Sequence, residues 1–168
     1  TIVATKAQSV DVFVWKVTNG VVNPTPQKHA FPVATPSYYW SVVPMPVGMT
    51  GYMGFFSTSA TNGLIWMNST MGEVSRSSGV RTSGGDVITI NGRVYVAYTA
   101  YSGDQKGVMR ICDITDGKYN QIFNYTMEAS GANGNSTASA CLMVRNNELY
   151  AVFGCTGSGL YFYRIACK

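Results

Sequence analysis

A strand, turn and strand pattern near the middle of the chain constrains the fold most. Residues 86–90 alternate small or polar with aliphatic side chains, Asn91-Gly92 follows, and residues 93–98 resume a β-branched and aromatic run. Asn-Gly is the dipeptide that most readily supplies the two positive φ angles of a type I′ turn, so we predict a β-hairpin here. A polar stretch at 101–106 and a third apolar run at 108–114 predict a third strand.

The same order of segments recurs on both sides of this hairpin. Downstream, residues 141–168 contain an apolar run, a turn at Arg145 to Asn147, a second run, a polar stretch and a third run. A fainter copy lies at 51–69. In each copy one glycine precedes the last run, at Gly63, Gly107 or Gly159. The spacing of the copies is unequal and no family repeat signature is present, so the pattern is compatible with true repetition and with the ordinary likeness of hairpins.

The rest of the chain also lacks helical periodicity. Residues 9–17 alternate polar with apolar side chains, which predicts a half-buried strand ending at Thr18-Asn19-Gly20. All six prolines lie within residues 24–46. Proline removes a backbone donor, so this segment is predicted to be an ordered covering arm or long loop rather than a central strand or helix. Residues 74–85 and 127–140 are poor in large apolar side chains and are predicted to be loops.

These patterns predict one all-β domain over residues 1–168. We expect a single antiparallel β-barrel or β-sandwich built from hairpins and meanders, covered by the Pro-rich arm at 24–46. A chain of 168 residues is long enough to bury a substantial core. The chain starts at Thr1 rather than Met, which is compatible with a matured product or with a domain excised from a longer protein, and we expect the excised domain.

Charge and hydropathy narrow the classes of partner. Only 12% of the residues are charged, and the net charge of +4 comes from scattered basic residues. Nucleic-acid binding needs a concentrated basic face, so we expect no nucleic-acid partner. The sequence holds no 18-residue apolar run and no basic-then-apolar leader, so we expect no membrane insertion.

The sequence offers little material for catalysis. There are eight carboxylates and one histidine, His29, and no G-x-S-x-G motif places a nucleophile beside it. Asp104, Asp113 and Asp116 lack the spacing of a calcium loop, and Asp116-Gly117 is typical of a turn. No phosphate-binding glycine loop occurs. We predict no catalytic residues, no metal site and no cofactor.

The four cysteines and three glycosylation sequons do not decide whether the protein folds in an oxidising or a reducing cellular compartment. None of the cysteines forms a Cys-x-x-Cys pair. The sequence is compatible with two disulfides in an oxidising compartment and equally with small buried thiols in a reduced protein. The four cysteines are Cys112, Cys141, Cys155 and Cys167. The sequons start at Asn68, Asn124 and Asn135, and chance alone predicts roughly two in this composition.

The function that the sequence best supports is recognition of a ligand or partner by loops on a rigid sheet scaffold. Tyr, Trp, Ser, Gly and Asn together are typical of adaptable binding surfaces. The predicted ligand-binding residues are an aromatic cluster, two arginines of a Ser-rich stretch and two residues above the central hairpin: Tyr38, Tyr39, Trp40, Arg76, Arg81, Tyr101 and Asp104. Each has a plainer interpretation as a clamp onto the core, a solvated arginine or an ordinary loop residue. Trp15 and Trp66 lie within apolar runs and are predicted to be core.

The chain combines low charge with abundant Thr, Ser, Asn, Gly and Tyr, short strands and long polar loops. In these features it resembles the globular attachment heads of non-enveloped viruses, such as astrovirus projection spikes. The resemblance covers overall character and transfers no residue. It implies an oligomeric β-barrel head on the virion surface that contacts a host cell-surface receptor or glycan, and folding in a cytosol without disulfides or used sequons.

Unpaired strand edges also predict a homo-oligomer, most simply a dimer. The alternatives are a secreted lectin-like carbohydrate-binding module and a secreted hydrolase that uses His29.

Overall fold

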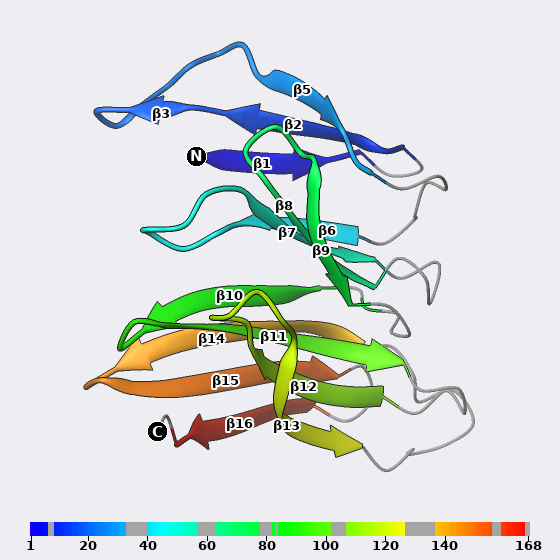
Figure 1. Ribbon diagram of the computed structural model, residues 1–168, viewed down its shortest axis with the longest axis vertical. Helices are drawn as coiled ribbons and strands as arrows, with labels where there is room; N and C mark the ends of the chain where they lie inside the picture. The colour runs from blue at the N-terminus through cyan, green and yellow to red at the C-terminus, as the bar shows by residue number, and fades with distance from the viewer. Residues whose placement is uncertain are drawn as a thin grey trace.

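The computed structural model describes residues 1–6, 9–32, 40–56, 63–77, 82, 84–101, 107–126, 137–155 and 159–166. These residues form antiparallel strands joined by turns, and none of them lies in a helix (Figure 1). Among them, therefore, no helix is long and apolar enough to cross a lipid bilayer. The all-β, antiparallel prediction is confirmed.

Both predicted hairpins are present. Asn91 and Gly92 have φ angles of 51° and 74° and join β10 (Gly85–Ile90) to β11 (Arg93–Tyr101), with Ile90 paired to Arg93. Asn146 and Asn147 have φ angles of 52° and 61° and join β14 (Thr137–Arg145) to β15 (Glu148–Cys155). Asn and Gly tolerate positive φ better than other residues, so the turn residues set the register of both hairpins.

The strands form four main sheets, which we number in chain order. The first sheet has the strand order β1 (Ile2–Thr5), β2 (Asp11–Trp15), β5 (Gln27–Ala30). The second runs β6 (Trp40–Pro44), β7 (Tyr52–Phe56), β8 (Leu64–Met67), β9 (Glu73–Ser77). The third runs β10, β11, β12 (Gly107–Asp113), β13 (Asn120–Thr126), and the fourth runs β14, β15, β16 (Gly159–Ile165). A small ribbon joins β3 (Val17–Thr18) to β4 (Val21–Val22).

The four sheets stack face to face in chain order (Figure 1). The first strand of each sheet lies beside the first strand of the next, since β1 contacts β6, β6 contacts β10 and β10 contacts β14. None of the sheets formed by the described residues closes into a barrel. The second, third and fourth sheets are successive antiparallel meanders packed face to face.

Three clusters of buried side chains fill the three spaces between consecutive sheets. Val94, Val96 and Tyr98 of β11 face the second sheet, whereas Tyr95 and Ala97 of the same strand face the fourth. The third sheet is therefore apolar on both faces, which explains why the sequence of β11 shows a continuous apolar run rather than alternation. The first and second sheets enclose a separate cluster that includes Val12, Val14, Phe56 and Ile65.

The Pro-rich segment contributes two strands. Within 24–46, residues 27–30 and 40–44 form the strands β5 and β6, so the prediction of an arm or long loop is wrong for these residues. Both strands lie at the edge of a sheet, where proline is tolerated. The ring of Phe31 packs against Phe56 with 4.6 Å between centroids. A Cβ at Gly54 would lie only 2.4 Å from the Phe31 ring, so only glycine permits this close approach. The described part of the segment thus belongs to the first two sheets and seals the space between them.

Two loop predictions were too long. Residues 74–77 lie in β9 and residues 137–140 lie in β14, although both stretches are poor in large apolar side chains. β9 is an edge strand that needs little apolar surface, and β14 gains its order from pairing with β15. Trp66 is half-buried against the cluster between the second and third sheets, as predicted. Trp15 is wrong as a core residue, because it lies on the outer face of the first sheet next to Phe13.

Candidate functional site

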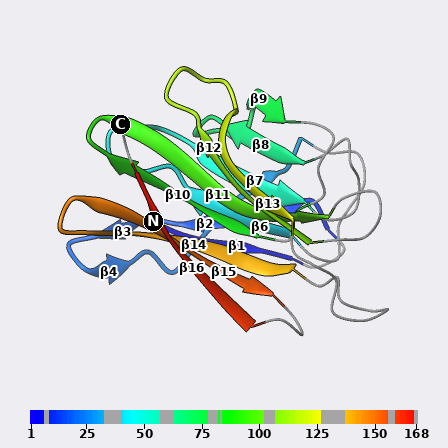
Figure 2. The same ribbon diagram turned by 90° about the horizontal axis from the view of Figure 1, so that it is seen from below.

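The stack has two edges of different character. At one edge the strands of the second, third and fourth sheets are joined by connections of two to seven residues, at 45–51, 68–72, 91–92, 114–119 and 146–147. At the opposite edge lie the described strand ends that border connections of three to ten residues, on the right in Figures 1 and 2. These connections span residues 31–39, 57–63, 78–84, 102–106, 127–136 and 156–158. We call this second side the long-connection edge.

The sequences of these connections are polar and uncharged for the most part. Residues 57–63 read STSATNG, residues 102–106 read SGDQK and residues 127–136 read MEASGANGNS. Side chains of this kind offer hydrogen bonds without the desolvation cost of charges. Rigid sheets that deliver several such segments to one edge are a common scaffold for binding.

Three of the predicted binding residues lie on strands at the long-connection edge. Trp40 is the first residue of β6 and pairs with Phe56, Tyr101 is the last residue of β11 and pairs with Gly107, and Arg76 is one residue from the end of β9. Trp40 and Arg76 lie on the first and fourth strands of the second sheet, roughly 14 Å apart at the usual strand spacing. Tyr38, Tyr39, Arg81 and Asp104 lie outside the described residues.

The guanidinium of Arg76 is engaged within the protein. Its Nε donates to Glu73 Oε1 at 3.1 Å and its Nη2 to Glu73 Oε2 at 2.5 Å. Nη2 also donates to the carbonyl oxygen of Pro32 at 3.2 Å. The hydrogen bonds from Arg76 hold the pKa of the Glu73 carboxyl below its usual range. A carboxylate ligand at Arg76 would have to compete with Glu73, so this arginine links the Pro-rich segment to β9 as well as being a binding candidate.

His29 does not face the carboxylate nearest to it in strand register. It pairs with Val12 on β2, and the preceding residue of β2, Asp11, points to the opposite face of the first sheet. The Asp11 carboxylate instead contacts Lys28 Nζ at 3.1 Å. Among the residues that the structure describes, no group of three His, Cys, Asp or Glu side chains is placed to hold a metal ion.

A buried carboxylate that the sequence analysis considered only as a calcium ligand joins β11 to the end of β12. Asp113 is 3% exposed and accepts hydrogen bonds from Arg93 Nε at 2.7 Å, from the Thr115 amide at 2.9 Å and from the Thr115 hydroxyl at 2.6 Å. The Thr115 hydroxyl oxygen in turn accepts from the Val94 amide at 2.9 Å. Burial opposes ionisation of Asp113, but these hydrogen bonds outweigh it and lower its pKa. The Asp-x-Thr spacing before a turn is the sequence signal that indicates this network.

The two cysteines whose side chains are described are free thiols in different surroundings. Cys112 is buried between the second and third sheets, 3.9 Å from the Tyr98 hydroxyl, and burial raises the pKa of its thiol. Cys141 is exposed on the fourth sheet, where partial burial and the nearby Asp86 carboxylate raise the pKa of its thiol. No disulfide joins these two residues. The Cys155 side chain and Cys167 lie outside the described residues.

We expect the two free thiols to differ in reactivity. In a Cys155→Ser/Cys167→Ser background, a small thiol reagent should modify one thiol in the dilute native protein and two after denaturation. Cys141→Ser should abolish the native reaction, because Cys112 is inaccessible between the sheets. Cys112→Ser is the matched control and should leave it unchanged. Native modification of Cys112 would contradict the packing described for this interface.

The two described sequons lie on the surface and use their side-chain oxygens within the protein. Asn68 Oδ1 accepts from the Thr70 amide at 2.9 Å, the Thr70 hydroxyl at 2.8 Å and the Gly72 amide at 2.9 Å. Asn124 Oδ1, on the edge strand β13, accepts from Arg110 Nε at 2.9 Å. Both asparagines therefore have a structural role in a turn or a strand pair. Asn135 lies outside the described residues.

Comparison of the sequence with protein-family models and with curated proteins finds no match.

Proposed function

We propose that this protein is a non-enzymatic recognition domain, the globular head of a viral surface spike that binds a host cell-surface receptor or glycan. The observation that supports this proposal best is the division of the stack into two edges. One edge carries connections of two to seven residues, including the Asn91-Gly92 and Asn146-Asn147 turns, and the other collects the strand ends that border the polar connections of up to ten residues. All seven residues that the sequence predicts for binding are on those connections or within two residues of them.

The proposed ligand chemistry follows from the side chains at the long-connection edge. Tyr38, Tyr39 and Trp40 supply flat amphipathic rings that stack on the apolar face of a sugar or on a partner's side chain. Arg76 and Arg81 supply forked donors for a carboxylate, as on an acidic sugar. Tyr101 and Asp104 supply hydroxyl and carboxylate groups for hydrogen bonds. No step of this recognition requires catalysis, a metal or a cofactor.

The same proposal includes the finer architecture and the location of the domain. We propose a layered β-sandwich rather than a barrel, because face-to-face packing of the sheets creates the buried clusters. Residues 24–46 act as its covering arm, with Phe31 packed against Phe56. The head is exposed on the virion surface, outside the cell.

A binding measurement on matched variants tests this function. We expect Trp40→Ala and Arg81→Ala to weaken attachment to susceptible cells, or to a glycan identified on an array, by about five-fold or more each, the equivalent of 1 kcal/mol. The reason is that both residues lie, in the sequence, on or next to the polar connections proposed to bind. Melting temperature is recorded in parallel, so that a residue that merely clamps the arm to the core is recognised by a lower melting temperature with unchanged binding.

Arg145→Ala is the control, since Arg145 is exposed at the end of β14 that borders a short turn. It should leave binding unchanged. If Trp40→Ala and Arg81→Ala both bind as well as the unmodified protein, the proposed site is wrong. Binding of free soluble sugar, combined with occupied sequons on the native protein, would instead favour a secreted lectin-like module.

A further inference from the structure

A cluster of aromatic side chains lies between β13 and β16, the last strands of the third and fourth sheets. The ring centroid of Tyr163 on β16 lies 4.7 Å from that of Phe123 and 6.5 Å from that of Tyr125, both on β13. The ring of Phe153, which is fully buried, lies beneath them, with its centroid 6.4 Å from that of Phe123 and 6.0 Å from that of Tyr163. Tyr161 packs against the same buried cluster. We call Phe123, Tyr125, Tyr161 and Tyr163 the aromatic platform.

The arrangement of the two sheets explains why large rings stand here. The third and fourth sheets approach most closely where β10 and β11 contact β14, whereas β13 and β16 are the strands farthest from that line in their sheets. Large side chains fill the space between these outer strands, so packing accounts for the rings. Packing does not account for the three hydroxyls, because phenylalanine would fill the same space.

The tyrosine hydroxyls of the aromatic platform have no hydrogen-bond partner among the residues that the structure describes. Other tyrosines of the stack use their hydroxyls within the protein: Tyr119 donates to the Met53 sulfur at 3.9 Å, and Tyr150 donates to Glu148 at 2.6 Å. Tyr125 is 43% exposed, so its ring and its hydroxyl are accessible. The platform therefore offers hydrogen bonds that the fold does not use.

The aromatic platform is also uncharged. Arg164 is the one charged residue in the described parts of β13 and β16, and it points to the opposite face of the fourth sheet, where it pairs with Glu148. Burial and the neighbouring hydroxyls of Tyr125 and Tyr161 raise the pKa of Tyr163, so its phenol stays neutral at physiological pH. A ligand at this site would meet rings and neutral hydroxyls.

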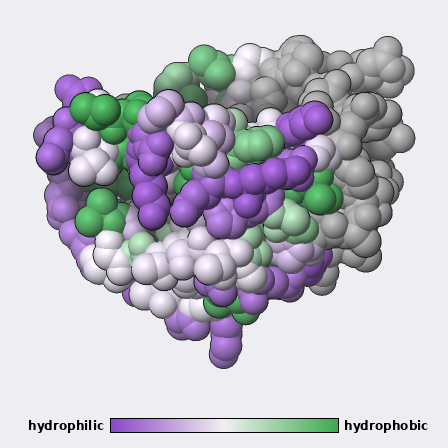
Figure 3. All heavy atoms as spheres, turned by 90° about the horizontal axis from the view of Figure 1, so that it is seen from above, coloured by the Kyte–Doolittle hydropathy of each residue, from purple (hydrophilic) through white to green (hydrophobic). Residues whose placement is uncertain are grey.

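The aromatic pair on the outer face of the first sheet has different surroundings. Phe13 and Trp15 lie there with ring centroids 6.3 Å apart, but the ion pair between Lys28 and Asp11 lies on the same face. Figure 3 looks onto this end of the stack, and hydrophilic side chains in purple extend across it between paler and green ones. A ligand at this end would meet charges as well as rings.

We propose that the aromatic platform is a binding site for a neutral saccharide. A sugar ring has an apolar C–H face that stacks on aromatic rings, and its hydroxyls both donate and accept hydrogen bonds, as the tyrosine hydroxyls do. A proline-rich peptide also docks on aromatic side chains, but its carbonyl oxygens only accept hydrogen bonds and would use half of what the hydroxyls offer. Without a cation in the platform, an acidic sugar gains nothing from its charge.

This inference rests on the proposed recognition function and deepens it by naming a class of ligand. It uses residues other than those proposed at the long-connection edge, since Trp40 lies on the second sheet and the platform joins the third and fourth. The two sites can therefore be tested separately.

An array of neutral and sialylated glycans tests the proposal, followed by titration of the neutral glycan that gives the strongest signal. We expect its binding to change little between about 50 and 500 mM salt, because no charge takes part. Tyr125→Ala should weaken binding about five-fold or more, because an exposed stacking ring is lost. Tyr163→Phe keeps the ring and removes a hydroxyl, so it should weaken binding about two-fold or more. It carries the test if Tyr125→Ala does not fold.

Phe162→Ala is the matched control. Phe162 is 70% exposed on the same strand as Tyr163 but points to the opposite face of the sheet, so this variant should bind as the unmodified protein does. If Trp40→Ala loses the neutral glycan while Tyr125→Ala and Tyr163→Phe retain it, the long-connection edge is supported and the platform is overturned. Binding of sialylated glycans alone, of a proline-rich peptide but no glycan, or of no glycan at all also overturns it.

Discussion

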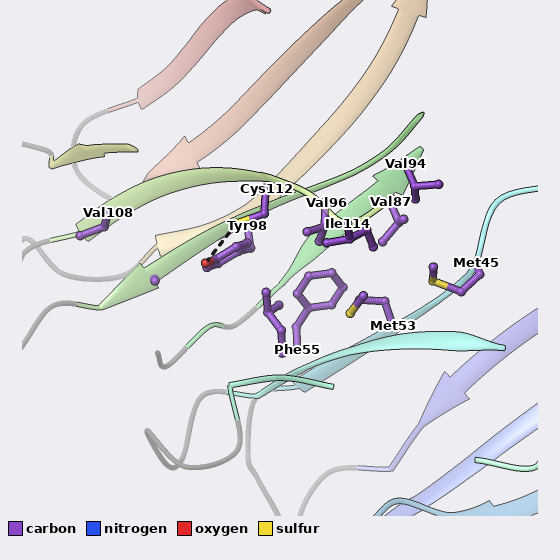
Figure 4. Packing of buried hydrophobic residues seen from close by; sticks show 12 residues of the cluster. Met45, Met53, Phe55, Val87, Val94, Val96, Tyr98, Val108, Cys112 and Ile114 are labelled. Carbon is purple, nitrogen blue, oxygen red and sulfur yellow. Dashed lines mark hydrogen bonds between the residues drawn. The ribbon is translucent and has the colours of Figure 1, made fainter. Parts of the chain in front are cut away.

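Truncating Phe55 to alanine is expected to lower the free energy of unfolding by about 3–5 kcal/mol, as removal of a fully buried aromatic ring generally does. Phe55 is 0% exposed and points from β7 toward the third sheet. Figure 4 shows its ring beside Met53, facing Val96 and Ile114. The cluster between these two sheets holds the second and third meanders together, so the loss falls on the interface between them.

The surroundings of Phe55 leave little means of closing the cavity. A Cβ at Gly85 would lie 2.4 Å from the Phe55 ring and 2.3 Å from the carbonyl oxygen of Ala97, so the ring fills the space that the glycine leaves. The sheets on both sides are hydrogen-bonded frameworks that cannot collapse by the thickness of a ring. Gly85→Ala should for the same reason be destabilising, because backbone would have to move.

Urea unfolding followed by circular dichroism measures the effect of Phe55→Ala. Phe55→Leu is the matched control and should cost less than Phe55→Ala, since it keeps most of the buried volume. Val21→Ala, at an exposed position, should be near neutral. If Phe55→Ala is no more destabilising than Val21→Ala, the second and third sheets do not pack as described.

The hairpins were predictable because their signals are local. Asn91-Gly92 and Arg145 to Asn147 each specify positive φ within a few residues of sequence, and the strands on either side follow from the turn. The strand at 9–17 was located for a similar reason, although the chain divides it at Lys16 into β2 and β3. Even the turn at Asp116 is satisfied locally, with its carboxylate accepting from the Lys118 amide at 3.0 Å.

The stacking of the sheets was not predictable from the same signals. Nothing local in β11 indicates that Val96 faces the second sheet while Ala97 faces the fourth, because both faces are apolar. A barrel or a two-layer sandwich would bury only one face of each sheet, and an apolar run without alternation is compatible with several arrangements. Long-range packing, not propensity, decides among them.

The candidate site was partly predictable. The composition of the sequence indicates where the loops lie, so the residues next to the polar connections could be predicted. How those residues are arranged in space could not, because it depends on which strand ends share an edge of the stack. Arg76 illustrates the difference: the sequence indicates a loop arginine, whereas the structure places it on β9 with a bidentate bond to Glu73 three residues earlier. The exposed face of the fourth sheet was missed because Leu160 and Phe162 look like core residues in a sequence.

Asp113 is the second position where we expect a large effect. Asp113→Ala should lower the free energy of unfolding by about 1.5–3 kcal/mol at neutral pH, the usual contribution of hydrogen bonds to a charged group, because the bonds from Thr115 and Arg93 to the buried carboxylate are lost. We place this below the cost of breaking a fully buried ion pair, since the Arg93 side chain is 51% exposed and water replaces part of its interaction. Asp113→Asn should cost less, because it keeps an oxygen acceptor for Thr115 and loses only the charge that faces Arg93.

The pH dependence of this effect has a definite sign. The pKa of Asp113 in the folded protein is lowered, since the hydrogen bonds from Thr115 and Arg93 outweigh the opposing effect of burial. A carboxyl whose pKa is lower when folded stabilises the protein above its unfolded pKa of about 3.9, and this contribution disappears as the pH falls through the folded value. Asp11, Glu73 and Asp116 also have lowered pKa values, so the total stability falls in acid for several reasons.

The informative quantity is the difference in free energy of unfolding between the unmodified protein and Asp113→Asn, measured by urea unfolding at about pH 7, 5 and 3. It should be constant between pH 7 and 5 and shrink at pH 3, and a difference that stays constant or grows in acid would show that the Asp113 charge does not stabilise the junction of β11 and β12.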